Sequence, residues 1–310
     1  MKKTVCIGSV TTDILISPVD NLPAPGVLQS ISGLNILVGG CAANAAIDMS
    51  KIGVPSKLVC KIGTDALGAL VKKSVEDTGI DTKGLIIDGN VQTTTSIVCI
   101  ASNGERSFLY APASVASMTR EEIPMDYLND CDIVFVSGAN LLTSFDGAPC
   151  AGFLKEMQQK GKYTVMDTAW DFDDIWLPKV KDSIKYLDLF MPSVEEAEKI
   201  SGQTEHEKMA DFFFELGAKS VIIKLGKSGA YVCENTDKRF ISKSFLVKSP
   251  KDTTGAGDAF CAGFLSGLAM GKGFEDSAVL ANATGAHCVM EVGASTGIKA
   301  ADEMLSAVLG

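Results

Sequence analysis

Short runs of β-branched and apolar residues alternate along the chain with longer segments in which apolar residues recur at the spacing of a helix face. The short runs predict buried strands at residues 4–7, 133–137, 163–166, 187–191 and 221–225. The longer segments, several of them closed by a following glycine, predict helices at residues 42–52, 65–78, 150–159, 195–201 and 207–216. This alternation predicts an α/β fold with a mostly parallel sheet and helices on both faces.

Two segments break the alternation. Residues 14–38 and 91–111 have the composition of strands, contain turn signals at Pro23–Gly26 and Asn103-Gly104, and hold no helical pattern. We interpret them as insertions that form a small β-sheet lid on a single domain spanning residues 1–310, and the plain alternative is an edge hairpin without function. Apolar lid strands can also pair between subunits, which predicts a homodimer through the lid.

Composition narrows the classes of partner. The 310 residues are 46% hydrophobic, which is ample for a packed core, and 28 Lys+Arg against 38 Asp+Glu give a net charge of −10. No block of Lys or Arg offsets this charge, so neither nucleic acid nor an anionic membrane is expected as a partner. No apolar run approaches the roughly 18 residues of a membrane span.

The cysteines are separated along the chain. The nine cysteines form no CxxC pair and there are only two histidines, which excludes zinc fingers and zinc ribbons and predicts free, buried thiols in a reducing cytoplasm. The basic start Met1-Lys2-Lys3 leads into a predicted strand rather than a signal peptide, which also favours a cytoplasmic location. With so few histidines, carboxylates and backbone dipoles remain to carry any chemistry.

Two phosphate-binding patterns are incomplete. Gly226-Lys227-Ser228 resembles the end of a Walker A loop, but the position of its upstream glycine is Val221, inside a predicted strand. No GxGxxG follows the first strand, which disfavours a nicotinamide or flavin enzyme.

The most informative segment is Asp252-Thr-Thr-Gly-Ala-Gly-Asp258, followed by a helical pattern over residues 259–270. Glycines at 255 and 257 let backbone N–H groups converge where the helix begins, which predicts an anion hole. Asp258 either stabilises the positive end of the helix or, beside a bound phosphoryl group, accepts the proton of an attacking hydroxyl.

This segment resembles the C-terminal signature of the ribokinase-like, or PfkB, family of carbohydrate kinases. Gly39-Gly40-Cys-Ala-Ala-Asn44 resembles the other family signature, and the resemblance spans essentially the whole chain. It implies a ribokinase-like α/β fold, a doubly wound αβα sandwich with a small β-sheet lid. It also implies a kinase, that is, a transferase that moves the γ-phosphoryl of ATP to a hydroxyl of a sugar or nucleoside.

The resemblance also implies roles for single residues. Asp258 is the general base, and the transferring phosphoryl is held by the amides of Gly255, Ala256 and Gly257. Substrate hydroxyls are bound by Asp13, Gly39, Gly40 and Asn44, which suits a polyol because a carboxylate and an amide recognise paired hydroxyls. Taken alone, Asp13 can equally be a turn residue that closes the first strand.

The nucleotide positions match less uniformly. ATP-binding positions fall on Lys224, Gly226, Gly229, Asn282 and Ser193. Lys224 stands where the family often has threonine, and it either reaches a phosphate or is a solvated strand-end lysine. Glu196 fits the residue that orders Mg²⁺ through water, while Ser193 replaces the usual asparagine. Asp252 and Thr254 match positions that in some members bind a monovalent cation such as K⁺.

The acceptor is the least determined part of this interpretation. Residues 104–110 resemble a lid hairpin, in which Arg106 or Tyr110 either contacts the acceptor or is structural. Residues 137–140 lack the glutamate of ribokinases, so ribose is less favoured than a ketose or another hexose-like acid or alcohol. A nucleoside would need aromatic side chains that stack on its base, and an aromatic content of 7% does not indicate such a cluster, although Phe108 can serve. Nucleoside kinase stays open as an alternative, as does a non-catalytic sugar-binding regulator, which would not need Asp258.

Overall fold

The computed structural model describes residues 1–309 and contains one large sheet, in the order β13-β12-β11-β10-β9-β8-β1-β4-β5. The strands from β11 to β5 in this order are parallel, and β12 and β13 add an antiparallel edge. The bounds are β1 (Thr4–Gly8), β4 (Ser56–Gly63), β5 (Leu85–Asp88), β8 (Ile133–Ala139), β9 (Tyr163–Thr168), β10 (Leu189–Phe190), β11 (Val221–Lys224), β12 (Ala230–Cys233) and β13 (Arg239–Ser242).

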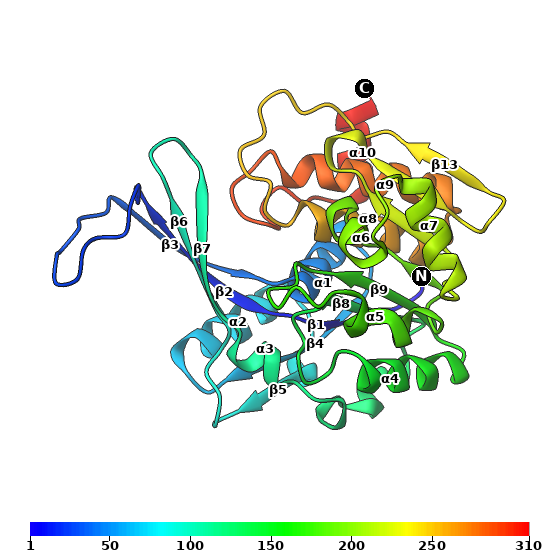
Figure 1. Cartoon of the computed structure of the whole chain (residues 1–310), viewed down its shortest axis with the longest axis horizontal. Coiled ribbons are helices and arrows are strands. Elements are labelled where there is room, and N and C mark those ends of the chain that lie inside the picture. The colour runs from blue at the N-terminus through cyan, green and yellow to red at the C-terminus, as the bar shows by residue number, and fades with distance from the viewer. Residues whose placement is uncertain (310) are drawn as a thin grey trace.

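Helices cover both faces of this sheet, as Figure 1 shows. One face carries α1 (Cys41–Ile52), α2 (Ala66–Asp77), α8 (Ala256–Ala269), α9 (Phe274–Cys288) and α10 (Ala301–Leu309). The other carries α3 (Ala113–Ser117), α4 (Ala148–Gln159), α5 (Leu177–Ile184), α6 (Val194–Ser201) and α7 (His206–Glu215). Short 3₁₀ turns occupy Thr82–Gly84, Arg120–Glu122, Met125–Leu128 and Gly226–Ser228. The central strands are therefore buried on both sides, which explains their continuous apolar runs.

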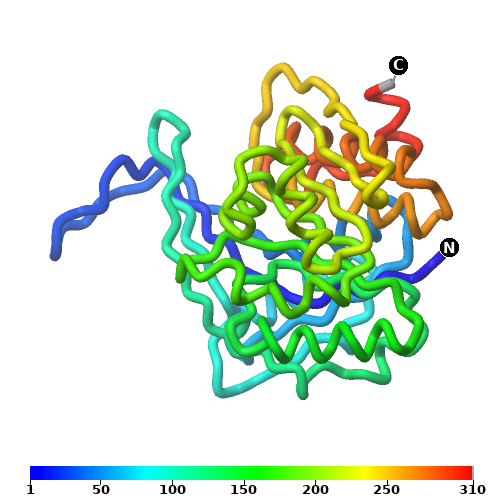
Figure 2. The backbone as a smooth tube through the Cα atoms, turned by 45° about the vertical axis from the view of Figure 1, so that its right-hand side comes forward, coloured from blue at the N-terminus to red at the C-terminus, as the bar shows by residue number. Residues whose placement is uncertain are grey.

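A small separate sheet has the order β3-β2-β6-β7 and projects from the body of the molecule (Figures 1 and 2). Its strands are β2 (Thr11–Ser17), β3 (Gly33–Gly39), β6 (Thr95–Ile100) and β7 (Arg106–Ala111). They come from the two segments without helical pattern, although β2 begins before residue 14 because only Ser9 and Val10 separate it from β1. The connection between β2 and β3 extends furthest from the body in both views.

The helix after the glycine-rich motif begins earlier than the apolar pattern predicts. Gly255 adopts φ 78° and caps α8, so the helix starts at Ala256 rather than at residue 259. Asp258 therefore lies inside the first turn, where helix N–H groups have no partner within the helix.

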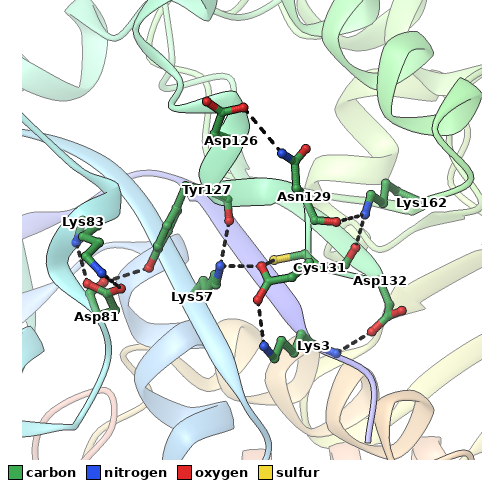
Figure 3. A network of polar contacts seen from close by, with 11 residues as sticks. Lys3, Lys57, Asp81, Lys83, Asp126, Tyr127, Asn129, Cys131, Asp132 and Lys162 are labelled. Atoms are coloured by element: carbon green, nitrogen blue, oxygen red, sulfur yellow. Dashed lines mark hydrogen bonds and ion pairs between the residues drawn. The ribbon is translucent and has the colours of Figure 1, made fainter.

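Polar contacts tie the amino ends of the central strands together (Figure 3). Lys57 on β4 donates to the carbonyl of Tyr127 and to the Asp130 carboxylate, and Lys3 also donates to Asp130. Lys162, just before β9, donates to the carbonyls of residues 129 and 131. This end of the sheet is occupied by structural contacts, which leaves the carboxyl ends of the strands for a ligand site.

All nine cysteines are free, and eight of them are buried. Within residues 1–309, no helix combines the length and the apolarity that crossing a membrane requires.

Candidate active site

Two helices begin side by side at the carboxyl ends of the central strands. Gly40, with φ 95°, precedes α1, and Gly255 precedes α8. A Cβ at Gly255 would lie 2.4 Å from the Cβ of Ala294, so this position requires glycine for both its backbone conformation and its space. The first-turn amides of α8 are thereby presented beside the start of α1, and their dipoles favour an anion.

Asp258 is held by a residue from the other glycine motif. Nδ2 of Asn44 on α1 donates to Oδ2 of Asp258 over 2.8 Å. Burial raises the pKa of Asp258 above its ordinary value, while the hydrogen bond from Asn44 and the charge of Lys224 limit the rise. A buried carboxylate with a raised pKa is suited to accept a proton. It lines a cavity of about 330 Å³ together with Glu196 and Lys224.

Lys224 is not a solvated strand-end lysine, because only 8% of it is exposed. Its Nζ lies 2.6 Å from Oδ1 of Asp167, which stands near the end of β9. Burial opposes its charging, but the negative charges of Asp167 and Glu196 outweigh burial and raise the pKa of Lys224. A Cβ at Gly257 would lie 3.4 Å from Nζ, so the ammonium sits directly beside the anion hole.

A second cavity, of about 490 Å³, begins at Lys224 and runs between the turn after β11 and helices α8 and α9. The turn needs glycine at 229, where φ is 97° and a Cβ would lie 2.0 Å from the carbonyl oxygen of Ser242. Asn282, also in the lining, donates to Oγ of Ser242 over 2.8 Å. The cavity has Gly226 at its rim and apolar side chains such as Phe260 in its wall. A largely apolar slot that ends at a helix N-terminus fits a base with a phosphate chain.

Ser193 and Glu196 form the capping box of α6. Oγ of Ser193 accepts the N–H of Glu196 over 3.3 Å, and Oε2 of Glu196 accepts the N–H of Ser193 over 2.9 Å. The hydroxyl of Thr168 donates to the same Oε2 over 2.8 Å. The serine thus fixes the position of Glu196, which suits a hard divalent cation. No cluster of three or more metal-ligating side chains occurs in residues 1–309, so most ligands of such an ion would be phosphate oxygens and water.

Asp13 faces a cavity of about 210 Å³ under the small sheet. A Cβ at Gly39 would lie 2.3 Å from its Oδ2, which explains glycine at that position. Thr11 donates to Oδ1 over 2.9 Å. Burial, helped by the charges of Asp258 and Asp252, raises the pKa of Asp13. The carboxylate is therefore available to ligand hydroxyls on one side only.

Arg106 and the two positions that match a monovalent cation site are bonded to one another. Nη1 of Arg106 lies 2.7 Å from Oδ1 of Asp252 and 2.7 Å from Oγ1 of Thr254. Oδ2 of Asp252 accepts the N–H of Gly293 over 3.0 Å. Burial opposes the charge of Asp252, but these hydrogen bonds lower its pKa. Oδ1 of Asp252 and Oγ1 of Thr254, which match the cation positions, are thus both bonded to a guanidinium in this structure.

The sequence motifs did not single out Asp167, Thr168 or Cys41, all of which line the cavity of Asp258. The first two directly follow the buried run predicted at residues 163–166. Polar residues at the carboxyl end of a parallel strand are a recognised signal of a site, and this signal was available.

The chain is similar to known proteins over nearly its whole length. Residues 1–301 match the family described as "pfkB family carbohydrate kinase". A 2-dehydro-3-deoxygluconokinase of Bacillus subtilis is 27% identical over 290 residues, which cover 91% of this chain and 89% of that protein. A ribokinase of Thermotoga maritima superposes with a TM-score of 0.84 at 28% identity, over 99% of each chain. The ribokinase of Arabidopsis thaliana complexed with ribose and ATP has a TM-score of 0.86 at 23% identity, over 99% of this chain and 98% of that one. These matches confirm the expected α/β sandwich with its small separate sheet.

Proposed function

The chain belongs to the pfkB family of carbohydrate kinases, and within that family we propose that it phosphorylates a sugar hydroxyl with ATP, using Asp258 as general base. The observation that carries this proposal is the placement of Asp258. Its carboxylate is buried in the first turn of α8, bonded to Asn44, and adjacent to the first-turn amides of that helix and to Lys224.

The transfer step follows from this arrangement. The acceptor hydroxyl gives its proton to Asp258 as its oxygen bonds to the γ-phosphorus. The bond from that phosphorus to the bridging oxygen breaks, and ADP leaves with the electron pair. The amides of residues 255–257 and the ammonium of Lys224 stabilise the charge on the phosphoryl oxygens. None of these groups requires a basic surface, which reconciles an anionic substrate with the net charge of −10.

The remaining positions divide between the two substrates. ATP occupies the cavity between α8, α9 and the turn after β11, with Asn282 in its wall. Glu196 is placed to order Mg²⁺ through water, and the ion would neutralise phosphate charge. Asp13 and Asn44 bind acceptor hydroxyls, with Gly39 and Gly40 leaving space for the sugar.

The outer face of the small sheet supports the proposed homodimer. Leu34 and Ile36 on β3 and Leu109 on β7 expose apolar side chains. Covering these strands with a second copy would bury that surface. A monomer in light scattering at micromolar concentration would contradict the dimer.

The test of the base is Asp258→Asn, assayed by ADP release with ketoses, aldoses, sugar acids and nucleosides. Loss of a general base lowers kcat by about 10² to 10⁴. The matched control is Asp276→Asn, since Asp276 is the third residue of α9 as Asp258 is of α8. If Asp258 only stabilised its helix, the two variants would behave alike and both would retain activity.

A further inference from the structure

Beside the acceptor cavity lies a larger hollow of about 780 Å³ with aromatic walls. Phe108 and Tyr110 on β7 contribute one wall, and Trp170 and Phe172, after β9, contribute the other. Tyr110 and Phe172 already contact each other, with ring centroids 5.0 Å apart. Phe108, Trp170 and Phe172 are exposed by 59%, 50% and 62%, which is unusual for large apolar side chains gathered in one place. We call these four residues the aromatic wall.

The wall is held in place by its own loop. The buried Asp171 accepts N–H groups from residues 173, 175 and 176, and Lys179 donates to it over 2.6 Å. Trp170 packs edge-on against the buried Trp176 at 4.9 Å. Of the non-glycine residues with positive φ in residues 1–309, Asn140 lines this hollow, and Asp174 and Trp176 belong to the loop that carries Trp170 and Phe172. Backbone strain of this kind is retained where the surrounding structure serves a site.

The hollow adjoins the cavities proposed for phosphoryl transfer. It shares Ser96, Phe108 and Tyr110 with the cavity that holds Asp13. It shares Trp170 with the cavity that holds Asp258. A molecule whose sugar lies at Asp13 and Asp258 can therefore place a further group against the aromatic wall.

Charge limits what that group can be. The only charged residue in the lining is Asp173, which is paired with Lys179 at 2.8 Å. In the neighbouring acceptor cavity the only cation is Arg106, and Asp252 already neutralises it. The described lining of these two cavities contains no unpaired cation that could bind the carboxylate of a sugar acid, so such an acceptor would form no ion pair here.

The hollow also holds an unsatisfied polar group. Asn140 is 2% exposed, and its Nδ2 donates to the carbonyl of Ala169 over 3.1 Å, which fixes the orientation of the amide. Its Oδ1 has no hydrogen-bond partner. A buried acceptor without a partner favours a ligand that brings an N–H or O–H donor to this end of the hollow.

From these observations we propose that the acceptor is a sugar joined to a flat, neutral heteroaromatic group, that is, a nucleoside or a related riboside. The heteroaromatic group stacks on the aromatic wall while a hydroxyl of the sugar faces Asp258. This rests on the kinase activity proposed above and identifies the class of its acceptor.

The test compares paired acceptors with the wild-type protein. Adenosine, inosine, cytidine and uridine are set against ribose and fructose, with kcat/KM from ADP release and affinity from calorimetry without ATP. We expect kcat/KM for the best nucleoside to exceed that for either free sugar by at least about tenfold. The variants Phe108→Ala and Phe172→Ala should each lower it for the nucleoside by about tenfold to a hundredfold. Phe172→Ala, which lies outside the acceptor cavity, should leave the values for free sugars within about twofold. Ile87→Ala, an exposed apolar residue on the remote strand β5, is the control.

The outcomes separate the two proposals. Turnover of free sugars as good as that of nucleosides, or equal losses for both in Phe172→Ala, overturns the acceptor class and leaves the kinase intact. Nucleoside binding that depends on the wall, without phosphoryl transfer, overturns the kinase and leaves the binding site. Neither binding nor turnover of nucleosides overturns the acceptor class.

Discussion

The ion pair between Arg106 and Asp252 makes a specific prediction about monovalent cations. Asp252 is 3% exposed, and it lies four positions before the first residue of α8, whose amides form the proposed anion hole. Arg106 comes from the small sheet and brings the positive charge that a bound K⁺ would otherwise supply. We therefore expect the wild-type protein to be insensitive to K⁺ and Arg106→Ala to become dependent on it.

The size of the effect follows from burial. Removing one partner of a buried ion pair costs about 3 to 5 kcal/mol, because the other charge is left uncompensated. The Arg106 side chain is 24% exposed, which places this pair at the lower end, about 3 kcal/mol. If this free energy is lost from the stabilisation of the transition state, kcat/KM in Arg106→Ala drops by about a hundredfold. With Oδ1 of Asp252 and Oγ1 of Thr254 released, K⁺ has oxygen ligands and should recover part of the loss.

The assay is initial rate against KCl concentration, with ionic strength held constant by tetramethylammonium chloride. Arg106→Lys keeps the charge and should remain insensitive to K⁺. Arg120→Ala is the matched control, since it removes an arginine whose pair with Glu156 lies on the opposite side of the sheet. Strong activation of the wild-type protein by K⁺, or an Arg106→Ala variant that K⁺ does not stimulate, would refute this reasoning.

Two further predictions concern Asp258 and its neighbours. Asn44 donates a hydrogen bond to the carboxylate of Asp258 and thereby lowers the pKa of Asp258. In Asn44→Ala this pKa should be higher, so the carboxylate is protonated sooner as pH falls and the acid limb of the kcat/KM profile should move to higher pH. An unshifted limb would show that Asn44 acts only on the sugar. Lys224→Met leaves Asp167 buried without its partner and should lower the free energy of unfolding by about 3 kcal/mol or more, measured in urea. Adding Asp167→Asn should restore stability but not activity, and recovery of both would limit Lys224 to a structural role.

The residues that could be predicted from sequence are those joined by a local motif. Asp258 and Gly255 lie three positions apart in one segment, and the prediction that they act together follows from that spacing. Asn44 belongs to a second such segment. In each case the glycines report a backbone requirement that sequence displays directly.

The remaining contacts depend on how distant segments meet. Arg106 reaches Asp252 across 146 positions, and Lys224 reaches Asp167 across 57. The motif that contains Asp252 does not indicate Arg106, and the strand end that carries Asp167 does not indicate Lys224. The aromatic wall shows the same limit, because a low aromatic content does not reveal that residues 108–110 and 170–172 converge. Lys224 illustrates this limit, since a lysine at a strand end is normally exposed to solvent and its burial becomes visible only in the fold.

The bond between Asn44 and Asp258 joins residues 214 positions apart, on helices that pack against the same face of the sheet. During synthesis α1 leaves the ribosome long before α8. Strand β1 can pair early with β4, but its other neighbour in the sheet, β8, is made later. The base therefore acquires its partner only when nearly the whole chain has been made and folded. A protein truncated before α8 can hold much of the sheet but no transfer site, so incomplete copies would be inert toward ATP.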